Sequence, residues 1–351
     1  MLSEGRKKNR VTLLDVARHA GVSRATASLV IRKSPLVSTE TRAKVEMAMQ
    51  DLGYVYNMGA ARLRADRSLT IGVVIPNLIN PFFTELLAGI ETVIDAAGMV
   101  VILVNSGDML ARQEALLTRM REHGVDGVIL CPAAGTDMSL VERMAEWDLP
   151  LVQVLRRVSD ECDYAGVDYG FGMHQAVDHL TELGHRDIAF AVHGPVHSAY
   201  QERVDAFRDA MELRGLDPGN IIRVPNQLAA IAQSAHLFTA GPGRSSSVVC
   251  FNDVVALGLS AGLYDLGVEI GRDFSLVGFD DVADAEALRP RLTSVATFPV
   301  AIGEGAATLL VDRLAQPDLA PRKLVKAPQL HIRQSSARWR GTNGGLSKNA
   351  G

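Results

Sequence analysis

A stretch near the start of the chain carries basic, hydroxyl and small side chains at the spacing of one helix face. If residues 24 to about 31 form a helix, Thr26 and Val30 turn toward neighbouring helices. The opposite face then presents the following residues to an outside surface: Arg24, Ala25, Ser28, Leu29, Arg32 and Lys33. A face that is polar, small and partly basic suits contact with nucleic acid.

This face has to be positioned by the elements on either side of it. Thr12 can cap a preceding helix, with Asp15 three positions on as its partner in a capping box. Gly21 supplies the backbone freedom that a tight turn needs, and Ser23 then caps the second helix. A third helix is expected over 39–52. The spacing predicts a helix-turn-helix, and an ordinary three-helix bundle with a polar outside is the alternative.

Charge is divided unevenly along the chain. The whole chain has a net charge of −4, from 36 Lys and Arg against 40 Asp and Glu. Residues 1–67 hold 13 basic residues against 6 acidic ones, whereas the remainder holds 23 against 34. A basic head on an acidic body is expected where only the head touches phosphates. A solvated basic surface on a small domain is the alternative.

Residues 53–68 form a basic segment with little apolar surface to bury. Alone in water, this segment should be mostly unfolded. Arg62, Arg64 and Arg67 attract phosphate, and Leu63 stands alone among them. The segment is therefore either a plain linker or one that becomes helical on DNA and inserts Leu63 into the minor groove as an apolar wedge.

From Leu69 onward, short apolar runs alternate with amphipathic helices. The strand candidates are 70–76, 100–106, 127–132, 149–155, 187–192, 220–225, 246–251 and 274–279. The helix candidates between them are 81–97, 109–123, 138–147, 172–183, 198–214, 228–240 and 253–266. Nearly continuous apolar strands are typical of parallel sheets covered on both faces. About eight such units exceed one sheet, so two doubly wound α/β lobes are predicted, with a break near 167–172.

In such sheets, ligands bind beyond the carboxyl ends of the strands. The loops there carry polar side chains at Asn77, 80–83, 105–108, Arg156, 193–197, 252–253 and 280–281. Asn252 and Asp253 could equally cap the following helix. The adjacent carboxylates of Asp280 and Asp281 are harder to explain as capping and indicate function. Arg203 has a surface salt bridge as its alternative role.

The chain lacks the motifs of the common α/β enzymes. It has no phosphate loop, no nucleophile elbow, no paired-histidine zinc motif and no dinucleotide fingerprint. His185, His193 and His197 are close in sequence but have no carboxylate or cysteine partner at metal-ligand spacing. We therefore expect no catalytic activity, no metal and no cofactor.

The sequence shows neither a signal peptide nor a run of apolar residues long enough to cross a membrane. Cys131, Cys162 and Cys250 are scattered without metal or redox spacing, and their odd count argues against a disulfide framework. The expected location is the cytoplasm, with no membrane partner. A free periplasmic sugar-binding protein would have a similar two-lobed body. Such a protein would carry an export signal and would lack a DNA-binding head, so the sequence excludes this class for this chain.

Several segments carry a recognisable pattern: VTLLDVARHAGVSRATASLVI at 11–31, VSTETRAKVEMAMQDLGY at 37–54, the hinge 57–63, TIGVVIPNLINPFF at 70–83, CFND, LVGFDD and LHIRQSSA. Over residues 11 to about 337, the chain resembles the lac repressor/galactose repressor family of bacterial regulators. The resemblance implies a homodimeric, ligand-controlled repressor on a near-palindromic double-stranded DNA operator. It also implies a core like that of periplasmic binding proteins, with a sugar or related metabolite as effector.

The resemblance implies roles for individual residues. The implied DNA contacts are Thr12, Arg24, Ala25, Thr26, Ser28, Leu29, Arg32, Asn57, Ala60, Leu63 and Arg64. The implied effector contacts are Asn77, Phe82, Phe83, Arg156, His197, Arg203, Asn252 and Asp280. Among them, Arg24 and Ala25 match the positions that choose operator bases, and Leu63 matches the minor-groove leucine.

Three positions depart from the family pattern. Leu29 and Ala61 stand where many members have arginine, so operator preference does not transfer. Leu155 stands where sugar and purine binders often have aspartate, with Arg156 beside it. This difference leaves an anionic or more apolar effector possible. The C-terminal tail lacks leucine heptads, so no tetramer-forming coiled coil is expected.

The predicted organisation is an all-α head followed by an α/β core of two lobes. The segments are a flexible tail (1–10), a helix-turn-helix domain (11–56), a hinge (57–68), the core (69–337) and a second flexible tail (338–351). Within the core, lobe 1 is expected at about 69–167 and 299–321, and lobe 2 at about 168–294 and 322–337. A ligand between the lobes would change their angle and so the spacing of two DNA-binding heads.

Overall fold

The computed structural model describes residues 11–31, 34–54, 67–240 and 244–340. Contacts divide the chain after Ser68 into a small head and a larger core. The predicted N-terminal tail, most of the predicted hinge and most of the C-terminal tail lie outside the described residues.

The head consists of three helices, as the sequence predicts. They are α1 (Leu13–His19), α2 (Arg24–Ile31) and α3 (Thr39–Asp51). Thr12 and Asp15 form the predicted capping box: Thr12 N donates to Asp15 Oδ2 at 2.9 Å, and Asp15 N donates to Thr12 Oγ1 at 3.4 Å. Gly21 has a φ of 66°, a conformation that glycine adopts at no steric cost in the turn between α1 and α2.

The second helix starts after Ser23, whose Oγ accepts a hydrogen bond from Thr26 N at 3.0 Å. The sequence predicted that Thr26 faces the head core. The structure buries Ala27 there instead, together with the expected Val30. Thr26 is only half-buried, because its hydroxyl is held at 2.9 Å by Ser23 Oγ. The helix-turn-helix is thus confirmed, with Ala27 in place of Thr26 as the second inward residue beside Val30.

The core contains two sheets, which define two lobes. The first sheet has the order β11-β5-β4-β3-β1-β2, and all of its paired strands are parallel. Its strands are β1 (Thr70–Ile75), β2 (Val100–Asn105), β3 (Gly127–Leu130), β4 (Leu151–Val154), β5 (Asp163–Val167) and β11 (Lys323–Lys326). In β1, Val73 and Val74 belong to separate apolar clusters, so both faces of the sheet are covered.

The second sheet has the order β12-β10-β9-β8-β6-β7 and is parallel except for β12, which runs antiparallel to β10. Its strands are β6 (Ile188–Val192), β7 (Ile221–Arg223), β8 (Ser247–Cys250), β9 (Ser275–Asp280), β10 (Thr293–Ala296) and β12 (Gln329–His331). The two predicted doubly wound parallel lobes are therefore present.

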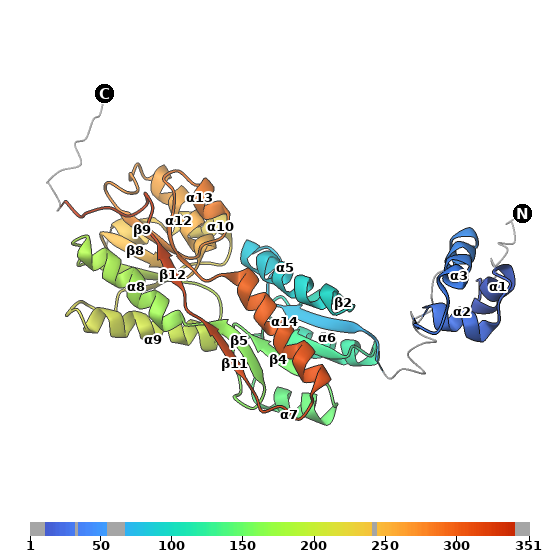
Figure 1. Cartoon of the computed structure of the whole chain (residues 1–351). Coiled ribbons are helices and arrows are strands. Elements are labelled where there is room, and N and C mark those ends of the chain that lie inside the picture. Colours follow the sequence, from blue (N-terminus) through green and yellow to red (C-terminus); the bar gives the residue numbers. More distant parts are fainter. Residues whose placement is uncertain (1–10, 32–33, 55–66, 241–243, 341–351) are drawn as a thin grey trace, which may run out of the picture. The chain divides into compact units, whose positions relative to one another are not determined.

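Helices cover the sheets of the core (Figure 1). The first lobe carries α5 (Pro81–Ala96), α6 (Leu110–Glu122), α7 (Ser139–Glu146) and α14 (Pro299–Ala315). The second carries α8 (Tyr169–Glu182), α9 (Ser198–Glu212), α10 (Leu228–Gln233), α11 (His236–Thr239), α12 (Asp253–Asp265) and α13 (Asp284–Ala287). The predicted helix 228–240 is thus two short helices. None of the helices in the described part of the chain has the length and apolar character to cross a bilayer.

Three segments of the described core connect the lobes: β5 to α8, β10 to α14, and β11 to β12. From the sequence, all of 322–337 was expected in the second lobe. However, β11 pairs with β5 in the first sheet, with Lys323 opposite Tyr164. The last crossing therefore falls between Lys326 and Gln329, because the chain completes the edge of the first sheet before it leaves it.

Glycines let α5 and α14 pack closely in the first lobe (Figure 1). A Cβ atom on Gly89 would lie 2.0 Å from the backbone oxygen of Val300. Gly89→Ala is expected to lower the free energy of unfolding by about 1–3 kcal/mol, since a backbone atom cannot move aside cheaply. The matched control is Gly170→Ala in α8, where the nearest atom lies 3.5 Å away.

In the control, alanine stabilises a helix more than glycine does, so Gly170→Ala should leave the free energy of unfolding unchanged or raise it by up to about 1 kcal/mol. Urea unfolding of both variants measures the difference. Equal stability of the two variants would contradict the close approach of the helices.

Candidate functional site

The head presents one face of α2 to solvent. Arg24 and Ala25 are exposed, and Ser28 and Leu29 are half-buried, on the side of the helix opposite to the head core. Thr12 is exposed at the start of α1. The structure thus leaves accessible the head residues that the sequence analysis assigned to DNA, as far as they lie in the described part of the chain.

The remaining residues assigned to DNA are Arg32, Asn57, Ala60, Leu63 and Arg64, and they lie outside the described residues. Their contacts, and the wedge role of Leu63, stay predictions.

A cavity of about 410 Å³ lies in the core, within the size range of small-molecule sites. All eight residues assigned to an effector line it: Asn77, Phe82, Phe83, Arg156, His197, Arg203, Asn252 and Asp280. Several of them follow strand ends in both sheets, as with Asn77 after β1 and Asn252 after β8. The topology therefore gathers them, because parallel strands of one sheet point their carboxyl ends the same way.

Arg203 is the buried cation of this cavity, with 6% of its surface exposed. Its guanidinium carbon lies 4.0 Å from the ring centroid of Tyr169, 4.4 Å from that of Phe251 and 4.8 Å from that of Phe279. Asp280 Oδ1 is 3.7 Å from Arg203 Nη2, and Arg203 Nε has no hydrogen-bond partner among the described residues. Cation–π contacts hold the side chain in place. The Nε–H of Arg203 thus remains available to a bound oxygen, and burial of the side chain excludes a surface salt bridge.

Arg156 differs from Arg203 because its donors are already engaged. Arg156 Nη1 donates to Asp108 Oδ1 at 2.6 Å and to Pro132 O at 3.0 Å, and Nη2 donates to Asp108 Oδ2 at 3.2 Å. Such a bidentate pair neutralises the charge at this wall of the cavity. The preceding Leu155 has a φ of 65°, so the chain turns sharply where it enters the site.

Two histidines beside the arginines are held neutral. Burial lowers the pKa of His193 to about 4, and the charge of Arg203 acts in the same direction. Burial, followed by the charge of Arg156, lowers the pKa of His197 to about 2. His197 Nδ1 accepts a hydrogen bond from Tyr200 N at 3.1 Å and so caps α9. His193 Nδ1 is buried without a hydrogen-bond partner among the described residues.

Asn252 combines the two roles that the sequence left open. Its Oδ1 accepts a hydrogen bond from Val255 N at 3.0 Å and caps α12, while the residue also lines the cavity. Asp253 turns away from the cavity and accepts hydrogen bonds from Ser294 Oγ at 2.6 Å and Val282 N at 2.9 Å. Burial raises the pKa of Asp253 to about 7, against the opposing effect of these bonds.

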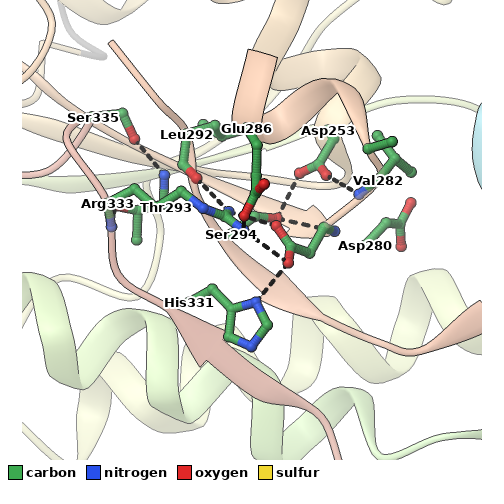
Figure 2. Close-up of polar contacts among 12 residues, drawn as sticks. Asp253, Asp280, Val282, Glu286, Leu292, Thr293, Ser294, His331, Arg333 and Ser335 are labelled. Atoms are coloured by element: carbon green, nitrogen blue, oxygen red, sulfur yellow. Dashed lines mark hydrogen bonds and ion pairs between the residues drawn. The ribbon is translucent and has the colours of Figure 1, made fainter. Parts of the chain in front are cut away.

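The adjacent carboxylates Asp280 and Asp281 have different roles. In Figure 2 the Asp280 side chain lies apart from the hydrogen bonds that involve His331 and Arg333. Asp280 lines the cavity, and burial raises its pKa well above the usual range. Asp281 instead accepts hydrogen bonds from His331 Nδ1 at 2.6 Å and from Arg333 Nη1 at 2.5 Å. Only the first of the two therefore faces the site directly.

The cavity also contains residues that sequence reasoning did not assign to it. Tyr169 and Phe251 form the aromatic cage of Arg203, and Asn226 lies beside His193, with its Oδ1 accepting from Gly194 N at 2.9 Å. Asn226 follows β7, so its position after a strand was a usable signal. Tyr169 follows β5 (Asp163–Val167), a strand that the sequence did not predict, so its position gave no such signal.

A pH-dependent loss of stability follows from the neutral histidines. The unfolded chain binds protons at histidine near pH 6.5, whereas folded His193 does so only near pH 4, so stability falls as pH drops from about 6.5 to 4. The slope attributable to His193 approaches about 1.4 kcal/mol per pH unit. His193→Gln should therefore show a shallower decline in urea unfolding between pH 6.5 and 4.

The raised pKa of Asp253 acts in the opposite direction, because the folded chain then binds more protons between pH 3.8 and 7. This contribution is the same in the wild type and the variant, so it cancels in their difference. His236→Gln is the control. Because His236 is exposed, this substitution should leave the dependence of the unfolding free energy on pH unchanged. A His193→Gln profile parallel to the wild type would contradict the buried neutral state.

The three thiols take no part in this chemistry. Cys131 and Cys250 are buried, and Cys162 is half-buried. Burial raises the pKa of Cys131 to about 11 and that of Cys162 to about 12, so both stay protonated thiols near neutral pH. Cys131 lines the cavity as a small apolar group.

Comparisons with known proteins match both parts of the chain. Residues 12–57 match the family model "Bacterial regulatory proteins, lacI family", and residues 177–336 match "Periplasmic binding protein-like domain". The transcriptional repressor PurR of Photobacterium profundum is 30% identical over 335 residues, covering 92% of this chain and 98% of PurR. The regulator RegA of Clostridium saccharobutylicum is 30% identical over 329 residues, covering 93% and 99%.

Solved structures agree with this assignment. The transcriptional regulator CelR in complex with cellobiose is 28% identical, with a TM-score of 0.70, and the match covers 93% of this chain and 100% of CelR. A lac repressor dimer bound to operator and the anti-inducer ONPF has the same fold, with a TM-score of 0.83 at 24% identity and coverage of 94% and 100%. The chain belongs to the lac repressor/galactose repressor family of ligand-responsive, DNA-binding transcriptional regulators.

Proposed function

We propose that the protein is a homodimeric repressor that places one α2 helix in the major groove of each half of a near-palindromic operator. The hinges at 57–68 would pair in the central minor groove, with Leu63 as the wedge between base pairs. A small molecule bound in the core cavity changes the angle between the lobes and thereby the population that can bind DNA.

The observation that carries the ligand part is the pair of buried atoms in one cavity that lack partners among the described residues. Arg203 Nε requires an acceptor, and His193 Nδ1 has no partner either. Leaving buried polar atoms unpaired costs free energy, so a ligand that pairs with them is favoured. Phe82 and Phe83 add an apolar wall, with their ring centroids 5.4 Å apart.

These contacts define a ligand class. The ligand carries an oxygen acceptor for Arg203, a second polar group near His193 and an apolar face for the phenylalanines. Sugars meet this description, and solved relatives bind cellobiose (CelR) and ribose (the Enterococcus faecium regulator, 26% identical). Because the Arg156 charge is already paired with Asp108, a neutral ligand suits the site better than a multiply charged one.

Apolar surface left uncovered on the core supports pairing with a second copy. Val100 and Ile102 are exposed on β2, an edge strand of the first sheet. A second cavity of about 470 Å³ has mostly apolar walls that include Leu228, Leu257 and Leu288. Exposed apolar surface such as that of Val100 and Ile102 often marks protein interfaces. Sedimentation at micromolar concentration should give twice the mass of the chain.

The DNA part is tested by selecting binding sites from random duplexes and footprinting the protein on the selected site at moderate salt. A symmetric protected region with two half-sites is expected. Protection without symmetry would reject the dimeric operator, and the absence of any enriched site would reject specific recognition.

The ligand part is tested by thermal shift with ribose, cellobiose, gluconate, adenosine and hypoxanthine. A compound present at 100 times its dissociation constant stabilises the folded state by roughly 2.7 kcal/mol. The shift should vanish in Asp280→Ala, because this substitution removes a carboxyl that lines the cavity. A shift that survives this substitution would place the ligand elsewhere.

A further inference from the structure

The backbone at the end of β9 adopts a conformation that side-chain-bearing residues rarely take. Asp280 has a φ of 113° and Asp281 a φ of 56°, so two consecutive non-glycine residues lie in the left-handed region. Such strain persists only where surrounding contacts fix it, and it commonly occurs at functional positions. Here this backbone conformation lets Asp280 line the cavity while Asp281 binds His331 and Arg333.

The Asp281 side chain is held by two residues of the last segment of the chain, His331 and Arg333, which are labelled in Figure 2. Its Oδ2 accepts from His331 Nδ1 at 2.6 Å and from Arg333 Nη2 at 3.1 Å, and its Oδ1 accepts from Arg333 Nη1 at 2.5 Å. Only 10% of the Asp281 side chain is exposed. Arg333 is fixed in turn, because its Nη1 also donates to Leu292 O at 2.7 Å.

The backbone of the same loop is held from the other side. Asp281 N donates to Ser294 Oγ at 3.2 Å, and Val282 N donates to Asp253 Oδ2 at 2.9 Å. Thr297 N donates to Asp280 O at 3.3 Å. The hydrogen-exchange rates of the amides of Asp281, Val282 and Thr297 therefore report whether the hydrogen bonds of this loop are intact.

His331 also places the loop next to the lobe crossings. It ends β12, the strand that follows the third crossing. Its ring centroid lies 6.4 Å from that of Phe298, which precedes α14 at the second crossing and has a φ of 57°. Lys326, at the end of β11, has its Nζ 5.2 Å from the Phe298 ring centroid. Contacts thus run without a gap from the loop of Asp280 to two of the three crossings.

We propose that Asp281 and His331 are positioning residues for the ligand site: they hold the strained loop so that the Asp280 carboxyl stays beside Arg203, and they tie that loop to the lobe crossings. This inference rests on the proposed function, since it gives the two residues a part in ligand binding. Neither residue lines the cavity itself.

The test follows hydrogen exchange of the full-length, ligand-free protein. In Asp281→Asn and in His331→Gln, the amides of Asp281, Val282 and Thr297 should exchange roughly tenfold faster, as expected when a charge-assisted hydrogen bond is lost. The amides of Val248 and Val249 in β8 should keep their protection. His331→Gln leaves Arg333 paired with Asp281, so it remains informative if Asp281→Asn folds poorly.

The matched control is Glu286→Gln. The Glu286 side chain also accepts from Arg333, at 3.3 Å, but it is 75% exposed and does not contact Asp281. Its substitution should leave all of these amides unchanged, and Asp281→Glu should restore part of the protection because it keeps the carboxylate. Unchanged exchange of the three amides in both test variants, or equal acceleration across β8, would overturn the proposal.

A second measurement connects the loop to binding. For each of ribose, cellobiose, gluconate, adenosine and hypoxanthine that binds the wild type, the dissociation constant should rise about tenfold in His331→Gln and stay unchanged in Glu286→Gln. Unchanged affinity in both would reject the positioning role. If none of these compounds binds the wild type, the ligand class of the proposed function is wrong, while the exchange result still decides the positioning of the loop.

Discussion

Replacing Arg203 by alanine is expected to lower the free energy of unfolding of the core by about 3–5 kcal/mol and to abolish its response to ligand. Removing one partner of a buried ion pair leaves the other charge without compensation, and the side chains of Arg203 and Asp280 are each only 7% exposed. The substitution also empties the cage formed by Tyr169, Phe251 and Phe279. Urea unfolding and thermal shift measure the two effects.

The size of the loss depends on whether Asp280 can take up a proton. Burial already raises its pKa, and Arg203 is the group that opposes this rise. Without Arg203 the pKa of Asp280 rises further, so the variant takes up the proton at a higher pH than the wild type, and its deficit in stability should shrink as the pH falls, because a protonated carboxyl needs no counterion. The double variant Arg203→Ala/Asp280→Asn should recover stability at pH 7 but no ligand response.

The control for this experiment is Arg208→Ala. Arg208 lies on the same helix, but it is 52% exposed and 3.9 Å from Asp205, and exposed pairs of this kind contribute about 0–1 kcal/mol. A loss in Arg203→Ala no greater than that of Arg208→Ala would show that Arg203 bears no buried charge. A ligand response retained by Arg203→Ala would remove this residue from the site.

The head could be predicted from sequence because its signals are local. The capping pair Thr12 and Asp15 lies three residues apart, and Gly21 marks the turn within the same stretch. Capping and turn chemistry act over one helical turn, so a short window contains the information. The exposed face of α2 follows from the helix period, and only the inward position, Ala27 instead of Thr26, was displaced.

The cavity could be predicted in outline because parallel topology brings strand ends together. What the sequence could not provide is which polar groups pair with one another. Asp108 and Arg156 are 48 residues apart, and their bond removes a free cation from the site. The different contacts of Asp280 and Asp281 likewise depend on their backbone angles and on His331, which is 50 residues away from Asp281.

The lobe boundaries were harder to predict because the strands beside them carry weak patterns. β5 (Asp163–Val167) contains a buried aspartate, Asp163, that accepts hydrogen bonds from the Arg313 guanidinium and from the Arg322 backbone amide, so the strand lacks a continuous apolar run. β11 is exposed along its whole length, with the sequence KLVK. Edge strands of this kind are specified by the sheet they join and not by their own composition.

Arg24→Ala is expected to weaken binding to the selected operator strongly while sparing the fold. Arg24 is exposed at the first position of α2, where a recognition helix contacts base edges. Loss of one arginine contact to a base costs about 1–3 kcal/mol. A dimer loses this contact in both half-sites, so the affinity should fall by roughly one and a half to four orders of magnitude.

Salt dependence distinguishes the two ways in which Arg24 could act. A base contact is lost on the operator but matters little on random DNA, whereas a phosphate contact is lost on both and reduces the salt slope by about one per contact. We expect the first pattern in fluorescence anisotropy at two salt concentrations. Lys44→Ala is the matched control, because it removes the same charge from the head at a site where Glu40 already pairs with it at 2.8 Å. Equal losses for Arg24→Ala and Lys44→Ala on both kinds of DNA would mean that the head binds through its overall charge, and base recognition by this face of α2 would then be rejected.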